Sequence, residues 1–330
     1  MIAARIEGGL GNQMFQYAAA KAAAVRLGTE LLLDAAAYNA VSERKGRSFL
    51  LDRFPNITEK KARPRDVMKL YPWVAVYDGL KGKTASIPRR IASKAFRYLC
   101  YGLGVMPKRL SGNALKSPVD AQSLALIPCS RVYFQGGSGY DAGFTAIPDN
   151  VYVVGGFESE KYFGGFAGHI RRAYSFAPSL RGLPLYAEIS SNQSVAVHIR
   201  RGDKTKSRKH EASNMDYLLS AMNILEHRIE NPIFYIFSDD MPWCMKNLPP
   251  LVKKPLRFAE SPPGTDNVLT DMFLMSNCKH NIIGPSTFSW WAAWLNSNPG
   301  KIVAAPHPKL WFRDTSGRSD LLPEKWIAVE

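Results

Sequence analysis

The chain is poor in cysteine, and its few cysteines lie far apart. The 330 residues include four, Cys100, Cys129, Cys244 and Cys278, without a Cys-x-x-Cys pair or a matching histidine cluster. A structural zinc site or a disulfide framework requires closer and more regular spacing. These absences favour a soluble protein of a reducing compartment, and we expect it in the cytoplasm.

Long apolar segments are also absent. The first residues, MIAARIEG, have neither the apolar core nor the cleavage site of a signal peptide. The longest uncharged stretch, residues 281–300, is interrupted by Gly284 and Pro285. A membrane-spanning helix needs about 20 mostly apolar residues, so we expect none in this chain.

Acidic residues are scarce relative to basic ones. Lys and Arg number 43 against 28 Asp and Glu, which gives a formal charge of +15. Much of the excess lies in residues 44–47, 60–65, 81–97 and 204–209, and such blocks are commonly solvated surface. A basic chain also suits an anionic partner, which can be a nucleic acid, phospholipid headgroups or a nucleotide. Peripheral contact with an anionic membrane stays open on this ground.

The second half of the chain alternates predicted strands with predicted helices. Strands are expected at residues 194–201, 233–237, 256–259, 281–283 and 302–304. Helices are expected between them at residues 215–229, 243–248, 267–277 and 289–295. This order implies right-handed crossovers and a parallel, doubly wound sheet, whose ligands bind at the carboxyl ends of the strands.

The first half has a weaker pattern. Short strands are expected at residues 2–7, 31–34, 131–134 and 151–154, and helices at residues 13–27 and 89–103. Gly28 is a natural stop for the first of these helices. The glycine- and aromatic-rich residues 155–168 are the best candidate for the crossing between two halves. We therefore divide the chain into domains of residues 1–155 and 156–330.

Two adjacent arginines, Arg200 and Arg201, end the apolar strand before them. Neighbouring residues on a strand point to opposite faces, so the two side chains are expected to do different jobs. A guanidinium binds phosphate oxygens bidentately and keeps its charge, which suits a diphosphate. Gly202 allows a sharp turn, and Asp203 can hold an arginine in place. The alternative is a pair of surface arginines, which the abrupt strand end and the flanking His198 make less attractive.

Residues 8–13, GGLGNQ, lie between a predicted strand and a predicted helix. The exposed N–H groups of such a turn and the helix dipole suit a phosphate. Gly9 and Gly11 match part of the dinucleotide fingerprint, but Met14 occupies its third glycine position and no Gly-Lys-Ser/Thr follows. A purely structural tight turn is the alternative.

Residues 284–289, GPSTFS, join another predicted strand to a helix that carries three tryptophans. Free N–H groups and hydroxyls at a helix N-terminus suit an anion. The alternative is ordinary capping of the helix by Ser286 or Thr287, with the tryptophans packed in the core.

The acids near these strand ends permit more than one interpretation. Asp239 and Asp240 resemble half of a Mg²⁺ or Mn²⁺ site, but no third acid is near in sequence and two arginines are available to neutralise a diphosphate. We expect no bound metal. Asp271 lies on a helix of otherwise apolar residues, where it either faces water or accepts two N–H donors of a guanine edge.

Five motifs occur in order along nearly the whole chain. They are GGLGNQMFQY at residues 8–17, GFESEKYF at 156–163, HIRRGD at 198–203, FSDD at 237–240 and STFSWW at 286–291. With them the chain resembles glycosyltransferase family 11, the α-1,2-fucosyltransferases, especially the bacterial members. The resemblance implies an α/β fold of the GT-B type, in which two Rossmann-like domains face each other across a cleft. The first would be the acceptor-side domain and the second the GDP-sugar donor-binding domain.

The resemblance also implies a reaction. L-Fucose would pass from GDP-β-L-fucose, with inversion, to a hydroxyl such as O-2 of a terminal galactose in a glycan, without a metal or another cofactor. Arg200 or Arg201 would hold the β-phosphate, while His198 and Asp271 would face the guanine. The other donor-binding residues implied are Gly9, Gly11, Asn12, Asp203, Asp239, Ser286, Thr287, Phe288 and Ser289.

The general base is unassigned, with Asp203 a weak candidate, and Lys204 follows it where bacterial relatives often carry an aromatic residue. The acceptor is a glycan or a lipid-linked oligosaccharide. Alternatives are a transferase that uses another GDP-sugar and a basic nucleic-acid-binding protein. The aromatic residues at 290–294 lie in an apolar segment, which favours core packing over nucleic-acid contact.

Overall fold

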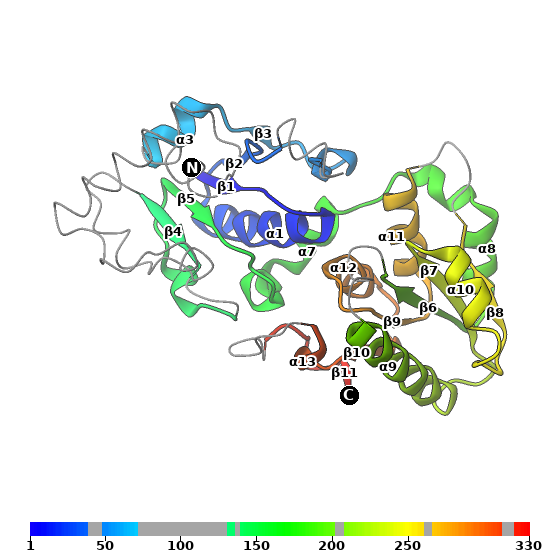
Figure 1. Ribbon diagram of the computed structural model, residues 1–330. Coiled ribbons are helices and arrows are strands. Elements are labelled where there is room, and N and C mark those ends of the chain that lie inside the picture. Colours follow the sequence, from blue (N-terminus) through cyan, green and yellow to red (C-terminus); the bar gives the residue numbers. More distant parts are fainter. Residues whose placement is uncertain (39–47, 72–130, 136–138, 202–207, 261–265, 312–319) are drawn as a thin grey trace, which may run out of the picture. The chain divides into compact units, whose positions relative to one another are not determined.

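The computed structural model describes residues 1–38, 48–71, 131–135, 139–201, 208–260, 266–311 and 320–330 (Figure 1). The chain forms two compact units: Met1–Asp52 with Ile57–Ile170, and Arg53–Asn56 with Arg171–Glu330. Each unit contains one parallel sheet, which confirms the predicted α/β class with two Rossmann-like domains. The predicted helix at residues 89–103 lies outside the described residues.

The sheet of the first unit has the strand order β3-β2-β1-β5-β4, and all neighbours are parallel. Its strands are β1 (Ile2–Arg5), β2 (Leu31–Asp34), β3 (Lys60–Lys61), β4 (Val132–Phe134) and β5 (Val151–Val154). β1 and β5 lie side by side although their sequences are far apart. All residues of β1, β2 and β5 are buried, as expected for strands covered on both faces.

Helix α1 (Leu10–Leu27) connects β1 to β2. Its buried alanines are small and allow close packing beside the sheet. The helix ends at Gly28, whose φ of 61° is left-handed and favours glycine. This end is as predicted, but the helix begins three residues before the expected Gln13, so Gly11 and Asn12 belong to its first turn.

The first unit continues beyond the domain division expected after residue 155. Phe157 and Tyr162 are buried against the ring of Phe144, with ring centroids 5.0 and 5.3 Å from it. The chain passes to the second unit between Ile170 and Arg171, within helix α7 (Ala167–Ala173). Aromatic packing therefore keeps residues 156–170 with the first unit. Helix α3 (Pro64–Leu70) also belongs to the first unit.

The sheet of the second unit has the order β11-β10-β9-β6-β7-β8, again with parallel neighbours. Its strands are β6 (Ser194–Ile199), β7 (Ile233–Ser238), β8 (Leu256–Phe258), β9 (His280–Ile282), β10 (Val303–Pro306) and β11 (Ile327–Val329). Counted along the chain, the strand order is 3-2-1-4-5-6, that of a Rossmann sheet. The order reverses between β6 and β9, so the topological switch point lies at these two strands.

Helices connect the strands of the second unit in the predicted alternation. They are α8 (Pro184–Ser191), α9 (Arg208–Glu226), α10 (Met241–Asn247), α11 (Asn267–Asn277), α12 (Thr287–Leu295) and α13 (Pro308–Trp311). Val195 and Val197 of β6 pack with Leu218 of α9 in one apolar core. Trp290 and Trp291 of α12 are fully buried, which confirms their predicted packing. The short elements β11, α8 and α13 were not predicted, because so few residues give little periodicity.

Four residues from the first quarter of the chain belong to the second unit. Phe54 is 1% exposed, and its ring centroid lies 5.1 Å from that of Tyr174 and 5.9 Å from that of Phe176. Arg53 forms an ion pair of 2.7 Å with Asp266. The segment Arg53–Asn56 therefore contributes to the core of a unit whose other residues come much later in the chain.

Candidate functional site

The carboxyl ends of β6, β7 and β9 form one edge of the second sheet. The register pairs Ile199 of β6 with Ser238 of β7, so Arg200 and Arg201 follow beside Asp239 and Asp240. β9 lies on the other side of β6. The structure thus brings together three of the predicted motifs at the switch point, where open α/β sheets bind ligands.

The ends of β6 and β9 approach closely because residue 284 is glycine. A Cβ atom at Gly284 would lie 2.9 Å from the backbone oxygen of His198, closer than real Cβ contacts. The loop that follows β9 therefore passes directly beside the end of β6. The sequence motif contains this glycine, but only the structure shows what it contacts.

One face of this strand end carries His198 and the start of α12. His198 is buried, and its ring centroid lies 5.6 Å from that of Phe288 in the first turn of α12. Ser286 is the N-cap residue, yet its side chain makes no capping hydrogen bond. Ser289 is buried and its hydroxyl bonds with the backbone oxygens of Gly284 and Ser286. The structure thus places Ser286, Phe288 and Ser289 together. The buried Ser289 hydroxyl stabilises the loop between β9 and α12.

Arg201 lies on the other face of the strand, against helix α10. Its Nε donates a hydrogen bond of 3.0 Å to Asp240 Oδ2, and its guanidinium carbon lies 3.7 Å from the centre of the Trp243 ring. The side chain is 14% exposed. Burial also raises the pKa of the Cys244 thiol in the same helix, which keeps this group protonated.

Arg200 is the more accessible of the two arginines. Its side chain is 40% exposed, and its Nε lies 3.7 Å from Asp239 Oδ2. The other oxygen of Asp239 accepts the backbone N–H of Arg201 at 2.8 Å. The predicted difference between the two arginines is therefore visible in their surroundings.

The acids at this edge contact the arginines. Asp239 contacts both arginines, while Asp240 binds Arg201 and caps α10 by accepting the N–H of Trp243 at 3.3 Å. Across the described ranges, no group of three His, Cys, Asp or Glu residues is arranged to hold a metal ion. Asp203, the candidate base, lies outside the described residues.

Asp271 is half-buried on α11. The helix leads back to the start of β9, so its first turns lie toward the carboxyl edge of the sheet. Asp266 caps this helix by accepting the N–H of Leu269 at 3.3 Å. Asp271 is thus on the carboxyl side of the sheet, where open α/β sheets bind ligands.

In the first unit, the glycine turn after β1 is held by side chains of α1 and by Tyr38. Gln13 Nε2 donates to the backbone oxygen of Gly8 at 3.2 Å, and the Tyr38 hydroxyl donates to the same oxygen at 2.9 Å. Gln16 Oε1 accepts the N–H of Glu7 at 2.8 Å. Sequence reasoning missed both glutamines, although polar residues on a buried helix face are a signal for such support.

Gly9 has open space beside it. A Cβ atom there would meet nothing within 4 Å, whereas one at Gly8 would lie 3.0 Å from Asn12 Nδ2. Gly9 is the N-cap residue of α1, and Gly11 and Asn12 follow in the first turn. The surrounding protein therefore leaves space for a side chain at position 9.

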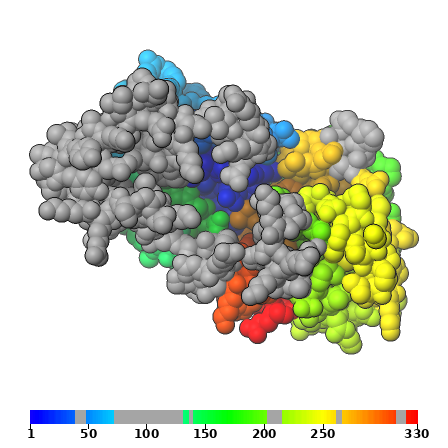
Figure 2. Space-filling model, in the orientation of Figure 1, coloured from blue at the N-terminus to red at the C-terminus, as the bar shows by residue number. Residues whose placement is uncertain are grey.

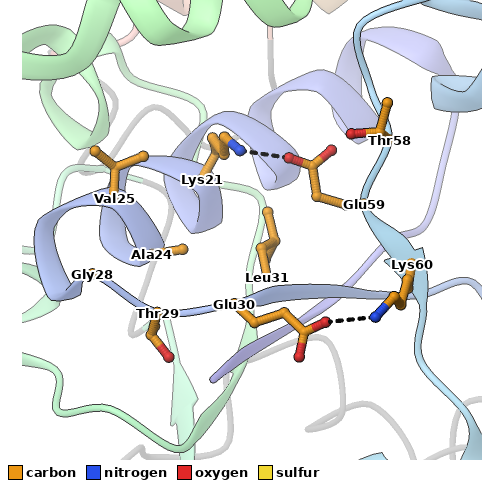
Figure 3. A pocket seen from close by; sticks show the side chains of 10 residues that line it. All are labelled: Lys21, Ala24, Val25, Gly28, Thr29, Glu30, Leu31, Thr58, Glu59 and Lys60. Atoms are coloured by element: carbon orange, nitrogen blue, oxygen red, sulfur yellow. Dashed lines mark hydrogen bonds and ion pairs between the residues drawn. The ribbon is translucent and has the colours of Figure 1, made fainter.

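A pocket of about 360 Å³ lies elsewhere in the first unit, at the end of α1 and the start of β2 (Figure 3). Its charged side chains are joined in two ion pairs, Lys21 with Glu59 at 2.6 Å and Lys60 with Glu30 at 3.4 Å. This is the amino edge of the sheet, opposite to the glycine turn. The pocket contains none of the predicted site residues.

No helix within the described ranges combines the length and the apolar character needed to cross a membrane.

Comparison with known proteins identifies the family. A model described as Glycosyl transferase family 11 matches residues 1–330. An alpha-1,2-colitosyltransferase of Escherichia coli is 30% identical over 338 residues, covering 100% of this chain and 99% of that protein. The galactoside 2-alpha-L-fucosyltransferase SEC1 of Bos taurus is 32% identical over 120 residues, 35% of this chain and 32% of that protein.

Among solved structures, NodZ alpha-1,6-fucosyltransferase soaked with GDP-fucose covers 91% of this chain and 96% of its own, with 15% identity and a TM-score of 0.43. The sequence matches carry more weight than this distant likeness. Because the family model and the colitosyltransferase both match from end to end, the chain belongs to glycosyltransferase family 11 and is a glycosyltransferase.

Proposed function

We propose that this glycosyltransferase moves L-fucose from GDP-β-L-fucose to O-2 of a terminal galactose in a glycan, with inversion and without a metal ion. Membership of family 11 and the similarity to a galactoside fucosyltransferase support this proposal. The observation that carries it is the placement of Arg200, whose side chain is 40% exposed at the carboxyl end of β6, beside Asp239.

The chemistry of the donor explains why an arginine is needed. Breaking the bond between fucose and GDP builds positive charge at C1 of the sugar and negative charge on the departing phosphate. A guanidinium that is already in place stabilises the phosphate charge without reorganisation. Arg200 supplies this group, and the N–H groups of α12 after Ser286 add a favourable dipole.

The remaining predicted contacts extend this proposal. His198 and Asp271 face the guanine, and the loop at Ser286, Thr287, Phe288 and Ser289 meets the phosphates. Gly9, Gly11 and Asn12 also bind the donor. The second unit, whose main stretch begins at Arg171, binds the donor, and the first unit binds the acceptor. The acceptor is a free glycan or a lipid-linked oligosaccharide at an anionic membrane surface, which suits the charge of +15.

Turnover of GDP-fucose in the presence of EDTA tests the proposal most directly. We expect release of GDP and transfer of fucose to a galactose-terminated acceptor at the same rate with and without EDTA. A strict requirement for Mg²⁺ or Mn²⁺ would contradict the arginine mechanism. A glycan array with labelled GDP-fucose would then identify the acceptor.

A second donor is favoured by one specific observation. The relative that matches along its whole length is named a colitosyltransferase, and colitose is fucose without its 3-hydroxyl group. A competition assay with GDP-fucose, GDP-colitose and GDP-mannose separates the donors. Strong preference for fucose requires a hydrogen bond to the 3-hydroxyl, because an apolar pocket rejects an added hydroxyl only weakly.

A further inference from the structure

Helix α10 packs on one face of the sheet, beside β7. Val195 and Val197 of β6 share an apolar core with Cys244 of α10. Ala196 and His198 alternate with them and point the other way. Arg201 continues the α10 side, so its surroundings differ from those of Arg200. The part of the chain that carries α10 and β8 reaches the molecular surface (yellow in Figure 2).

Arg201, Asp240 and Trp243 form a closed set of contacts. Arg201 Nε donates to Asp240 Oδ2 at 3.0 Å, and Asp240 Oδ1 accepts the backbone N–H of Trp243 at 3.3 Å. The Trp243 ring lies 3.7 Å from the guanidinium carbon of Arg201 and completes the set. Each residue contacts the other two. The Trp243 ring stacks on the guanidinium of Arg201, and the Asp240 carboxylate fixes the orientation of that guanidinium through its hydrogen bond.

Asp239 connects these contacts to Arg200. One oxygen of Asp239 accepts the N–H of Arg201 at 2.8 Å, and the other lies 3.7 Å from Nε of Arg200. The backbone N–H of Arg201 is therefore hydrogen-bonded to Asp239 after β7, while its side chain contacts α10. Both contacts fix the backbone at the strand end and so the direction of the Arg200 side chain.

We infer that Trp243 is a positioning residue of the transferase: it holds Arg201 against Asp240, and this anchors the strand end so that Arg200 faces the donor diphosphate. The inference deepens the proposed function and rests on it. It assigns different roles to the two arginines, since Arg201 is the anchor and Arg200 is the phosphate contact. Trp243 itself touches no substrate.

The strength of the stacking contact gives the size of the effect. A cation–π contact of this kind corresponds to about 2- to 30-fold in an equilibrium or rate constant. We expect Trp243→Ala to lower kcat by about this factor and to weaken the binding of GDP less, because the misplaced Arg200 contributes most when the phosphate charge develops. Trp243→Phe keeps an aromatic face and should recover most of the loss.

A double-mutant cycle tests whether Trp243 acts through Arg201. Kd for GDP is measured by calorimetry, and kcat and KM for GDP-fucose by GDP release, for Trp243→Ala, Arg201→Met and the double variant. We expect Trp243→Ala to have no further effect in the Arg201→Met background, since the contact is already lost. Met245→Ala is the matched control, because Met245 lies on the same helix and is 42% exposed.

Several results would overturn the inference. Equal losses from Trp243→Ala with and without Arg201 would show that the two residues act independently. If Trp243→Phe lost as much kcat as Trp243→Ala, and both had a lowered Tm, Trp243 would only support packing. If Arg201→Met fails to fold, the kcat and Tm values of Trp243→Ala and Trp243→Phe still distinguish positioning from packing. A wild-type protein that does not bind GDP would instead contradict the proposed function.

Discussion

Two neighbouring arginines have different surroundings in this chain. Arg201 is enclosed by α10, and the side chain of Arg200 is 40% exposed beside Asp239. The alternation of side chains along a strand predicts that the two differ, and the contacts with Asp240 and Trp243 show which one is enclosed. At the scale of single residues, this difference supports the assignment of Arg200 to the diphosphate.

The role of Arg200 predicts a large effect on catalysis. Arg200→Lys retains one positive charge but loses the planar fork, and Arg200→Ala loses both, so we expect kcat to fall about a hundredfold or more for alanine and less for lysine. Steady-state kinetics with GDP-fucose measures the effect. Arg257→Ala is the control, because Arg257 lies on β8 and is 56% exposed. A loss of less than about threefold in Arg200→Ala would argue against the assignment.

His280 makes stability depend on pH. Burial and, to a lesser extent, Lys279 lower the pKa of His280 below its ordinary value of 6.5, and its Nδ1 accepts the N–H of Ile302 at 3.0 Å. The unfolded chain therefore binds a proton more readily than the folded one, so stability is complete above pH 6.5 and falls as the pH decreases through the folded pKa.

The measurement is urea unfolding between pH 7.5 and 5. We expect the free energy of unfolding to decrease by about 1.4 kcal/mol for each unit by which the folded pKa is lowered. His280→Asn should reduce this part of the pH dependence, since the amide does not titrate. An identical pH profile for the variant would show that His280 contributes nothing.

At the scale of elements, the switch point depends on close approach of two strand ends. Gly284→Ala would bring a Cβ atom to 2.9 Å from the His198 oxygen, so β6 and the loop after β9 must separate. We expect a loss of about 1–3 kcal/mol in the free energy of unfolding and weaker binding of GDP, measured by urea unfolding and calorimetry.

Gly300→Ala is the control for this substitution. A Cβ atom at Gly300 would have its nearest neighbour at 3.8 Å, an ordinary contact, so stability and GDP affinity should both stay close to wild type. If Gly284→Ala behaved like Gly300→Ala, close approach of the two strand ends would not be needed for the donor site.

At the scale of the whole molecule, the second unit contains residues from outside its main stretch of chain. The segment Arg53–Asn56 places Phe54 in the second unit, against Tyr174 and Phe176. The two units are therefore not two consecutive pieces of sequence. Correct folding of the second unit requires a segment made about a hundred residues before the rest of it.

Phe54→Ala tests this requirement. Phe54 is 1% exposed, so its truncation should lower the free energy of unfolding by about 3–5 kcal/mol, while Arg53→Ala, which removes an exposed ion pair, should cost less than about 1 kcal/mol. Hydrogen exchange of residues 171–330 before and after the Phe54 substitution would show whether the effect falls on the second unit. Unchanged protection there would contradict the assignment of this segment.

Much of the local structure follows from the sequence because it depends on near neighbours. The alternation of strands and helices from β6 to β10, the end of α1 at Gly28 and the arginine pair at a strand end all come from short-range periodicity and backbone preferences. The five ordered motifs also identify the family, and the whole-length family match confirms it.

Only the tertiary structure shows which distant residues meet. Arg201 and Asp240 are 39 positions apart, and Arg53 and Asp266 are 213 apart, so no periodicity connects them. Trp243 likewise has no sequence signal as a partner of Arg201, because a tryptophan in a short helix is most simply explained by core packing. The order of strands in the sheet determines these contacts, since it brings β7 beside β6 and holds α10 over their common edge.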